Sequence, residues 1–306
     1  MKVARFSVGA EACVGLVNGD TIVEQAGASV LDVLLRDPSD LNVDGPRHAI
    51  ADVRLLCPAA PLARNAFCVG WNYLKHFEEG QSRRDNAITE PPTRPTFFTK
   101  ATGAIVGPQD PIESHASLTS MLDWEVELAL VIGKQGRDIP ESEAMEHVAG
   151  FTVALDITAR DIAREHGGQW FRGKSLDRTS PVGPWLVTPD ELGDLAERSI
   201  TCRVNGELVQ SALLGDMYFG LKRIIAELSA GLTLQAGDLI LTGTPEGTGI
   251  GRDPARFLAI GDAVEAAIEG VGELRTAVVG TYPGVVDTAD IFDYVYRSSS
   301  AGGSPA

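Results

Sequence analysis

Alternating apolar and polar residues dominate the chain from residue 96 onward. This period of two predicts β-strands in PTFFTK, AIVG, WEVELALVIG and VAGFTVALDIT, and again in SITCRVNGELVQ, DLILTGT and DAVEAAIEGVGELRTAVV. A helix is predicted over residues 139–149, with Pro140 at its first position. Another is predicted within residues 217–234, capped by Asp216 and closed by Gly231. Because strands outnumber helices and do not alternate with them, we expect a strand-rich α+β fold rather than a doubly wound sheet.

The first 60 residues have a pattern of their own. Asn18-Gly19 is typical of a hairpin turn, residues 29–37 predict a short helix, and residues 55–64 form a Pro-bounded connector. A buried strand is expected at residues 66–69, followed by a glycine turn, a short helical stretch and a long polar loop over residues 80–95. We therefore predict a small N-terminal domain (1–60), a main domain (61–296) and a disordered tail (297–306).

Composition and charge narrow the choice of partners. The chain has 306 residues, of which 44% are hydrophobic and 22% charged, as is usual for a soluble globular protein. A net charge of −16 argues against nucleic acid and anionic membrane surfaces as partners. The apolar runs are too short to span a bilayer, the N-terminus has no apolar signal segment, and the four cysteines are scattered. We expect a cytoplasmic protein with free thiols and a small-molecule substrate.

Carboxylates interrupt two of the predicted strands. Glu125 and Glu127, two residues apart, leave the same face of one strand, about 7 Å apart along it. Asp156 stands at the end of a second strand. If the two strands are neighbours, the three carboxylates can converge and hold a hard divalent cation, Mg²⁺ or Mn²⁺. The alternative is an edge strand whose glutamates face solvent.

Several motifs together resemble the fumarylacetoacetate hydrolase family, in its acylpyruvase and 2-hydroxyhepta-2,4-diene-1,7-dioate isomerase-like branch. They are VGWNYLKHFEE, LDWEVELALVIGK, GFTVALDITARD, GKSLDRTSPVGPWLVT, VNGELVQ and DLILTGTPEGTG, in that order over about two thirds of the chain. The resemblance implies a mixed β-sandwich roll as the catalytic domain, a homodimer or larger homo-oligomer, a divalent metal, and substrates that are 2-oxo acids, often 2,4-dioxo acids.

The resemblance also implies roles for individual residues. Glu125, Glu127 and Asp156 match the metal ligands of the family, and His76 with Glu79 matches its catalytic dyad. At a spacing of i and i+3 on a helical turn, a carboxylate can fix the tautomer of an imidazole and raise its basicity. On spacing alone, a surface histidine explains the same pattern.

Three substrate contacts and one cation complete the implied site. Lys174 matches the lysine that faces the substrate near the metal, where a cation could stabilise an enolate. By resemblance, Tyr73, Arg160 and Thr244 lie near the substrate. Surface ion pairs for the two cations and core packing for Tyr73 are the ordinary alternatives. Ala163 departs from the family, because many relatives carry glutamine there, and this points to a different or bulkier substrate tail.

These residues predict a metal-dependent C–C bond hydrolase. Residues 74–92 would fold over a 2,4-dioxo acid of the acylpyruvate or fumarylpyruvate type, and His76 with Glu79 would activate water to release pyruvate. The breakdown of aromatic compounds is an attractive setting by resemblance. The alternative is an oxaloacetate-type decarboxylase, or an isomerase or dehydratase of a 2-oxo acid, since these reactions need the same enolate stabilisation. A hypothesis outside the enzymes is a non-catalytic scaffold or ligand-binding protein with this fold, and the intact set of site residues argues against it.

Overall fold

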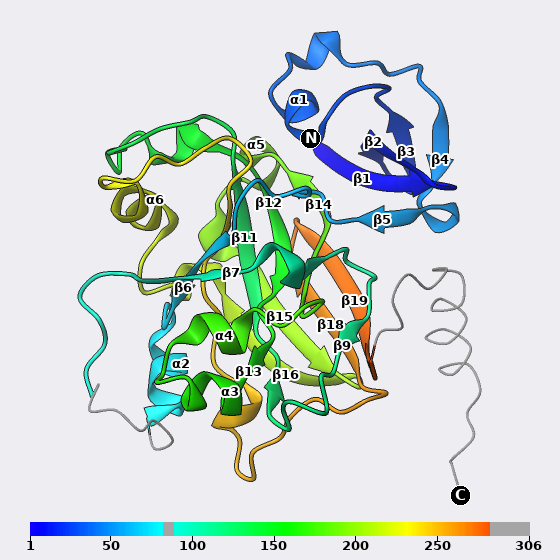
Figure 1. Ribbon diagram of the computed structural model, residues 1–306. Coiled ribbons are helices and arrows are strands. Elements are labelled where there is room, and N and C mark those ends of the chain that lie inside the picture. The colour runs from blue at the N-terminus through cyan, green and yellow to red at the C-terminus, as the bar shows by residue number, and fades with distance from the viewer. Residues whose placement is uncertain (82–88, 282–306) are drawn as a thin grey trace, which may run out of the picture.

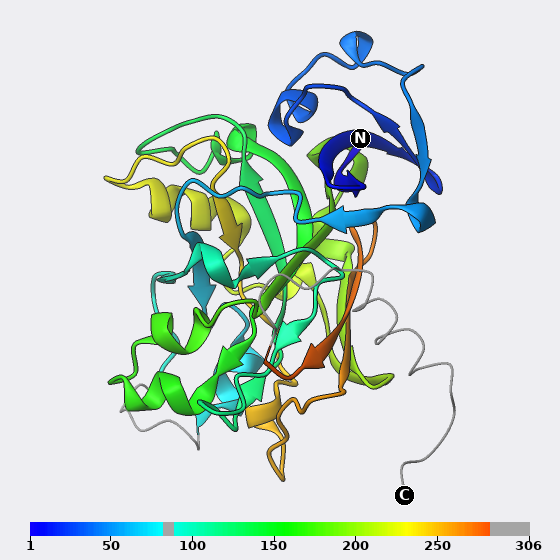
Figure 2. The ribbon, with the colours of Figure 1, turned by 45° about the vertical axis from the view of Figure 1, so that its right-hand side comes forward.

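A computed structural model of the chain describes residues 1–81 and 89–281 (Figures 1 and 2). The strands of its large sheet are β1 (Lys2–Val8), β2 (Glu11–Asn18), β3 (Thr21–Glu24), β4 (Arg47–Ala49), β5 (Arg54–Leu56), β6 (Ala66–Gly70), β7 (Thr96–Lys100), β8 (Ile105–Val106), β11 (Val126–Ile132), β12 (Val148–Leu155), β14 (Ser180–Val187) and β17 (Leu239–Leu241). A second sheet contains β9 (Ile112–Glu113), β15 (Ser199–Val204), β16 (Glu207–Leu213), β18 (Ala263–Ile268) and β19 (Gly272–Val279). The short strands β10 (Leu122–Asp123) and β13 (Thr158–Ala159) pair with each other. The helices are α1 (Val30–Leu34), α2 (Leu74–Glu79), α3 (Arg160–Glu165), α4 (Trp170–Lys174), α5 (Pro189–Leu192) and α6 (Leu221–Ser229).

The two large sheets form the layers of the fold. The 12-stranded sheet runs in the order β4-β3-β2-β1-β14-β12-β11-β17-β6-β7, with β5 beside β1 and β8 beside β14. The five-stranded sheet runs β16-β15-β18-β19-β9 and packs against the centre of the first. Figure 1 shows α2, α3 and α4 together at one end of these layers and the strands β1–β5 at the other. The predicted strand-rich α+β fold is confirmed.

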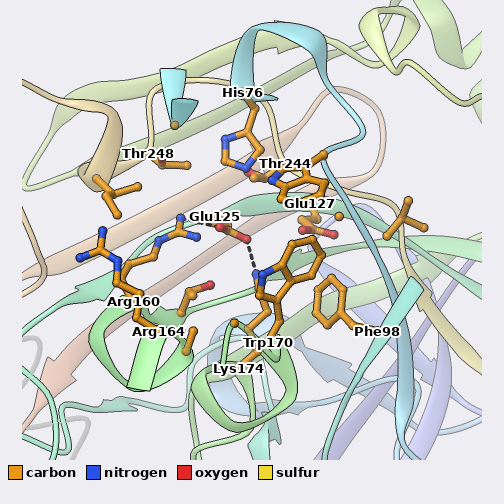
Figure 3. Close-up of a pocket in the computed structure, with 18 of the residues that line it drawn as sticks. His76, Phe98, Glu125, Glu127, Arg160, Arg164, Trp170, Lys174, Thr244 and Thr248 are labelled. Carbon is orange, nitrogen blue, oxygen red and sulfur yellow. Dashed lines mark hydrogen bonds and ion pairs between the residues drawn. The ribbon is translucent and has the colours of Figure 1, made fainter. Parts of the chain in front are cut away.

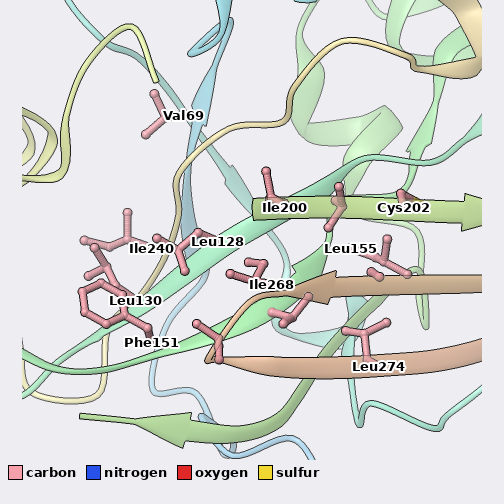
Figure 4. Packing of buried hydrophobic residues seen from close by; sticks show 14 of the residues in the cluster. Val69, Leu128, Leu130, Phe151, Leu155, Ile200, Cys202, Ile240, Ile268 and Leu274 are labelled. Carbon is pink, nitrogen blue, oxygen red and sulfur yellow. The ribbon is translucent and has the colours of Figure 1, made fainter. Parts of the chain in front are cut away.

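β11 is apolar on both faces because both faces are buried in the core. All seven residues of β11 are buried. Leu128 and Leu130 face the five-stranded sheet and pack with Phe151 of β12 and Ile200 of β15 (Figure 4). Ala129 of β11 belongs to a second apolar cluster on the opposite face of the sheet. A strand buried on both faces is expected to be a near-continuous apolar run, so Glu127 in this strand, with Glu125 just before it, is the exception that needs a cause.

The N-terminal strands extend the main sheet. Val3 of β1 pairs with Leu186 of β14. β2 and β3 form the predicted hairpin, whose last pair is Asn18 with Thr21 and whose turn residues are Gly19 and Asp20. Ser29 begins α1 with a capping box, in which its hydroxyl accepts from the Asp32 amide and the Asp32 carboxylate accepts from the Ser29 amide. The predicted boundary at residue 60 stays a prediction, and the predicted tail over residues 297–306 lies outside the described residues.

Both helices predicted by periodicity are corrected. The helix over 139–149 is wrong: only a 3₁₀ turn, Ala144–His147, forms, and Val148 already pairs with Ile132 as the first residue of β12. Pairing in a buried central strand outweighs the local helical pattern. The helix over 217–234 is shortened to α6, which starts after Gly220 and ends at Ser229.

Asn72 causes the late start of α6 and positions the turn before α2. Its Nδ2 donates to the carbonyls of Thr242 (2.7 Å) and Phe219 (3.1 Å), and its Oδ1 accepts from the Phe219 amide at 2.7 Å. The Tyr218 amide donates to the Asn72 carbonyl at 2.7 Å. Residues 218 and 219, which form a bend before α6, are therefore tied to the segment that leads into α2.

We predict that Asn72→Ala lowers the free energy of unfolding by about 3 kcal/mol, because it leaves three buried backbone groups without their partner. Urea denaturation measures the change. Asn65→Ala is the matched control, since the Asn65 amide makes one long contact of 3.5 Å to Thr99 Oγ1, and we expect it to cost about 0.5 kcal/mol or less. Equal losses in the two variants would contradict the assigned role of Asn72.

Candidate active site and metal centre

Antiparallel pairing brings the three predicted carboxylates together. Glu127 of β11 is opposite Ala154 of β12, and the Asp156 amide donates to the Glu125 carbonyl at 2.8 Å. One carboxylate oxygen from each of Glu125, Glu127 and Asp156 lies within 4.8 Å of the other two, and all three residues are buried. The solvent-facing alternative is therefore wrong: the three carboxylates form one acidic cluster.

Three cations line this cluster. Lys174 Nζ donates to Glu125 Oε2 and to Asp156 Oδ2, each at 2.6 Å. Arg160 Nη2 donates to Glu125 Oε1 at 2.5 Å. Lys100, whose side chain is 0% exposed, places Nζ 2.7 Å from Asp156 Oδ1. The alternative of surface ion pairs for Lys174 and Arg160 is wrong, because their ion pairs with the cluster are largely buried.

The cations are distributed unequally among the carboxylates. Burial alone would raise the pKa of Glu125, but Lys174 and Arg160 outweigh it and lower that pKa to about 2. Burial raises the pKa of Glu127 well above its usual range, and the neighbouring Asp156 raises it further. Glu127 accepts a hydrogen bond from the Gly243 amide at 2.7 Å, and no lysine or arginine among residues 1–81 and 89–281 forms an ion pair with it. The three cations thus pair with Glu125 and Asp156, and Glu127 is the member of the cluster without a cationic partner among the described residues.

The predicted dyad is assembled on α2. His76 Nδ1 lies 2.8 Å from Glu79 Oε1, and both side chains are largely buried. Thr248 Oγ1 donates to the same oxygen at 2.8 Å, and the Gly247 amide donates to Glu79 Oε2 at 2.7 Å. Burial would raise the pKa of Glu79, but His76 and these donors lower it overall. An ionised Glu79 accepts from His76 Nδ1–H, which leaves His76 Nε2 as the basic atom.

The loop over residues 243–250 joins the dyad to the acidic cluster. Asp123, fully buried, accepts from the amides of Gly249 (2.6 Å) and Ile250 (3.0 Å) and from Arg160 Nε (2.9 Å). Burial raises the pKa of Asp123, and Arg160 opposes that rise. The glycine-rich TGTPEGTG segment therefore acts as a set of backbone donors to carboxylates, consistent with the missing strand–loop–helix context of a nucleotide loop.

A cavity of about 410 Å³ is lined by His76, Glu125 and Glu127. Figure 3 shows His76 on one side of it, Glu125 and Glu127 behind, and Phe98 with Trp170 opposite His76. Lys174, Arg160 and Thr244 also line the cavity. Thr244 Oγ1 accepts from Gln210 Nε2 at 2.9 Å, which leaves the Thr244 hydroxyl proton available for a ligand.

Tyr73 is placed differently from the other predicted contacts. It is 1% exposed, precedes α2 and is not among the described residues that line the cavity. Its hydroxyl has no hydrogen-bond partner in the described part of the chain, and burial raises its pKa. The core-packing alternative fits Tyr73 better than a direct substrate contact. The lid predicted over residues 74–92 lies partly outside the described residues.

Four supporting residues were missed by the sequence analysis: Lys100, Asp123, Gln210 and Thr248. Lys100 is the last residue of the strand PTFFTK, and a lysine at the end of a strand is usually exposed to solvent. Asp123 stands two residues before Glu125, so the same period of two could have placed it beside the cluster. Gln210 and Thr248 gave no such signal, because their contacts cross more than 30 residues.

The fold and this cluster define a strand-rich protein whose buried oxygen donors fit a divalent metal ion. Residues 65–279 match the family model of the fumarylacetoacetate (FAA) hydrolase C-terminal, and residues 1–58 match that of Rv2993c-like, N-terminal. The chain therefore belongs to the fumarylacetoacetate hydrolase family, as its motifs predicted.

Known members of the family carry different activities in their names. The chain is 40% identical over 263 residues to the oxaloacetate tautomerase YisK of Bacillus subtilis (strain 168), covering 86% of this chain and 84% of the relative. A fumarylacetoacetate hydrolase from psychrophilic Exiguobacterium antarcticum superposes with a TM-score of 0.80 at 42% identity, over 92% of this chain and 100% of the other. A 2-hydroxyhepta-2,4-diene-1,7-dioate isomerase from Mycobacterium marinum gives 0.73 at 33% identity over the same shares.

No helix of the described residues is long and apolar enough to cross a membrane.

We predict that Glu127→Gln and Asp156→Asn each weaken Mn²⁺ binding about 100-fold or more, because each removes a charged oxygen donor. Calorimetric titration of the apo protein measures the dissociation constant. Glu79→Gln is the matched control: it removes a buried carboxylate of the same cavity region that lies outside the cluster, and Mn²⁺ affinity should change about two-fold or less. Equal weakening in all three variants would show that Mn²⁺ does not bind at the cluster.

Proposed function

We propose that this protein is a divalent-metal-dependent tautomerase that interconverts the keto and enol forms of oxaloacetate. The observation that carries the proposal is an acidic cluster of three carboxylates, two of which, Glu125 and Glu127, line the same cavity as the His76 imidazole. The chain also resembles an oxaloacetate tautomerase over most of its length. This is the isomerase alternative of the sequence analysis, and the relatives favour it over the C–C hydrolase that the motifs first indicated.

Tautomerisation moves one proton and breaks no carbon–carbon bond. In the keto-to-enol direction a proton leaves C3 and a proton is added to the oxygen on C2. His76 Nε2 is the group that takes the C3 proton, because Nδ1 is engaged by Glu79. Glu79 stays ionised, orients the ring and stabilises the imidazolium that forms.

The opposite side of the cavity binds the 2-oxo acid. Glu125, Glu127 and Asp156 would hold the metal ion, which when bound polarises the 2-oxo group and stabilises negative charge on its oxygen. Lys174 holds two of these carboxylates in place and lines the cavity, so its charge also acts on that oxygen. The Thr244 hydroxyl is available to donate to the substrate carboxylate. Mg²⁺ and Mn²⁺ both suit an all-oxygen site.

Hydrolysis of an acylpyruvate is the second candidate. The same dyad could activate a water, and one protein whose structure superposes well is named a fumarylacetoacetate hydrolase. The breakdown of aromatic compounds, a cytoplasmic location and a homodimer or larger homo-oligomer remain predictions from the sequence.

The proposal predicts that the Mg²⁺- or Mn²⁺-loaded protein accelerates the decay of the ultraviolet absorbance of enol-oxaloacetate, and that a chelator abolishes the acceleration. Pyruvate formation is followed in parallel with acetylpyruvate as substrate. Enol decay without pyruvate release supports the tautomerase. Metal-dependent pyruvate release from acetylpyruvate, with no effect on enol decay, would replace it with the hydrolase.

We predict that His76→Asn lowers tautomerase turnover by about 10²–10⁴-fold, because the proton acceptor is lost while the acidic cluster stays intact. The Mn²⁺ dissociation constant should be unchanged. His48→Asn serves as control, because His48 also pairs with a glutamate, Glu24 at 2.8 Å, but lies on β4 in the N-terminal region. Full turnover in His76→Asn would contradict the assigned base.

A further inference from the structure

One side of the cavity is a wall of three aromatic rings, which oxaloacetate has no group to match. Trp71 lies in the turn between β6 and α2, Phe98 on β7 and Trp170 at the start of α4, and all three line the cavity. The Trp71 and Trp170 ring centroids are 4.7 Å apart at 85°, and those of Phe98 and Trp170 are 5.3 Å apart at 90°. Edge-to-face packing of this kind makes one continuous apolar surface.

The rings of this aromatic wall are held in place. Trp71 has φ +55°, an uncommon conformation for a large side chain. Its ring packs edge-on against the fully buried Phe77 of α2, with centroids 5.8 Å apart. Trp170 fills the space beside Gly70, where any side chain would overlap its ring. A ligand would therefore meet a preformed surface, which lowers the cost of binding.

The aromatic wall lies next to the place where the carboxylate and 2-oxo group of the substrate, its head, would bind. Lys174 Nζ, which bonds Glu125 and Asp156, lies 5.0 Å from the centroid of the Phe98 ring. A 2-oxo acid whose head docks at the acidic cluster would thus direct its C3 substituent toward the wall. Figure 3 shows Phe98 and Trp170 on the same side of the cavity, next to Glu127.

The size of the cavity and the apolar surface of the aromatic wall leave room for a tail that oxaloacetate does not have. A cavity of about 410 Å³ falls in the range that drug-sized ligands fill, roughly 300–1,000 Å³, and oxaloacetate is far smaller. A carboxylate placed against aromatic faces loses hydration without gaining a partner, whereas a phenyl ring gains from leaving water.

We propose that the aromatic wall is a subsite for a planar apolar substituent on C3, so that aryl-substituted 2-oxo acids such as phenylpyruvate are ligands and tautomerase substrates of this protein. Only C3–H breaks and O–H forms, as with oxaloacetate. The inference rests on the proposed function in one respect, namely that the 2-oxo acid head docks at the acidic cluster.

The test compares two ligands that differ only by the ring, pyruvate and phenylpyruvate, on the Mn²⁺-loaded protein. Wild type should bind phenylpyruvate at least about ten-fold more tightly than pyruvate, as burial of a phenyl group implies. Trp71→Asn, whose new residue tolerates positive φ, should remove about ten-fold of phenylpyruvate affinity and change pyruvate affinity about two-fold or less. Phe98→Leu is the second variant, should Trp71→Asn fail to fold.

Phe171→Ala is the matched control, because Phe171 lies beside Trp170 on α4, is 44% exposed and is not among the described cavity-lining residues. It should leave both affinities unchanged. Equal affinity of wild type for the two ligands, or equal weakening of both in Trp71→Asn, overturns the subsite. Selective binding of phenylpyruvate without its tautomerisation would keep the subsite and reject phenylpyruvate as a substrate. The decay of enol-oxaloacetate, measured on the same protein, tests the proposed function separately. Binding of neither ligand would reject the subsite.

Discussion

Four carboxylates buried side by side are the constraint on which this structure depends. Asp123, Glu125, Glu127 and Asp156 are each at most 3% exposed, and buried like charges of this kind are stable only when cations or strong donors surround them. Arg160, Lys174 and Lys100 supply three positive charges, and the amides of the 243–250 loop supply further donors. Because Glu127 has only an amide partner among the described residues, the balance is incomplete at the place where a divalent ion would bind. Structural stability and metal affinity thus arise from the same group of charges, since removing a cation would leave a buried acid unpaired.

The 243–250 loop makes one unit of the two halves of the site. It donates to Glu127 through Gly243, to Glu79 through Gly247 and Thr248, and to Asp123 through Gly249 and Ile250. The loop therefore sets the distance between the basic imidazole and the acidic cluster, and small residues are required where it approaches other segments closely: a side chain at Gly243 would lie 2.6 Å from the Asn72 Cβ. Asn72 in turn links this region to α6 and to the turn before α2. Precise placement of proton-transfer groups needs such a supporting shell.

The part of the site that follows from local periodicity was predictable, and the part that follows from long-range packing was not. Because side chains on a strand alternate with a period of two, Glu125 and Glu127 were expected on one face. Antiparallel pairing of β11 with β12 then brought Asp156 to them, as expected. The hairpins at Asn18-Gly19 and Asn205-Gly206 formed where their turn residues predict. The helix over 139–149 failed because Val148 and Ala149 are needed in β12, a tertiary demand that a local window does not contain. Lys100 and Thr248 escaped for the same reason: each acts on a residue more than 50 positions away in the sequence.

Members of this family differ in reaction although they share the fold, and the cavity suggests where the difference originates. Enolate stabilisation at the acidic cluster is common to hydrolysis, decarboxylation and tautomerisation, so the head of the site cannot discriminate among them. The outcome depends on what the substrate carries beyond C3 and on whether water can reach it. In this chain those positions are occupied by Trp71, Phe98, Trp170 and the small Ala163, which together leave an apolar space beside the basic His76. Under the proposed function, a wall of this kind would keep water away from the carbon next to His76, and this would favour proton transfer over attack by water.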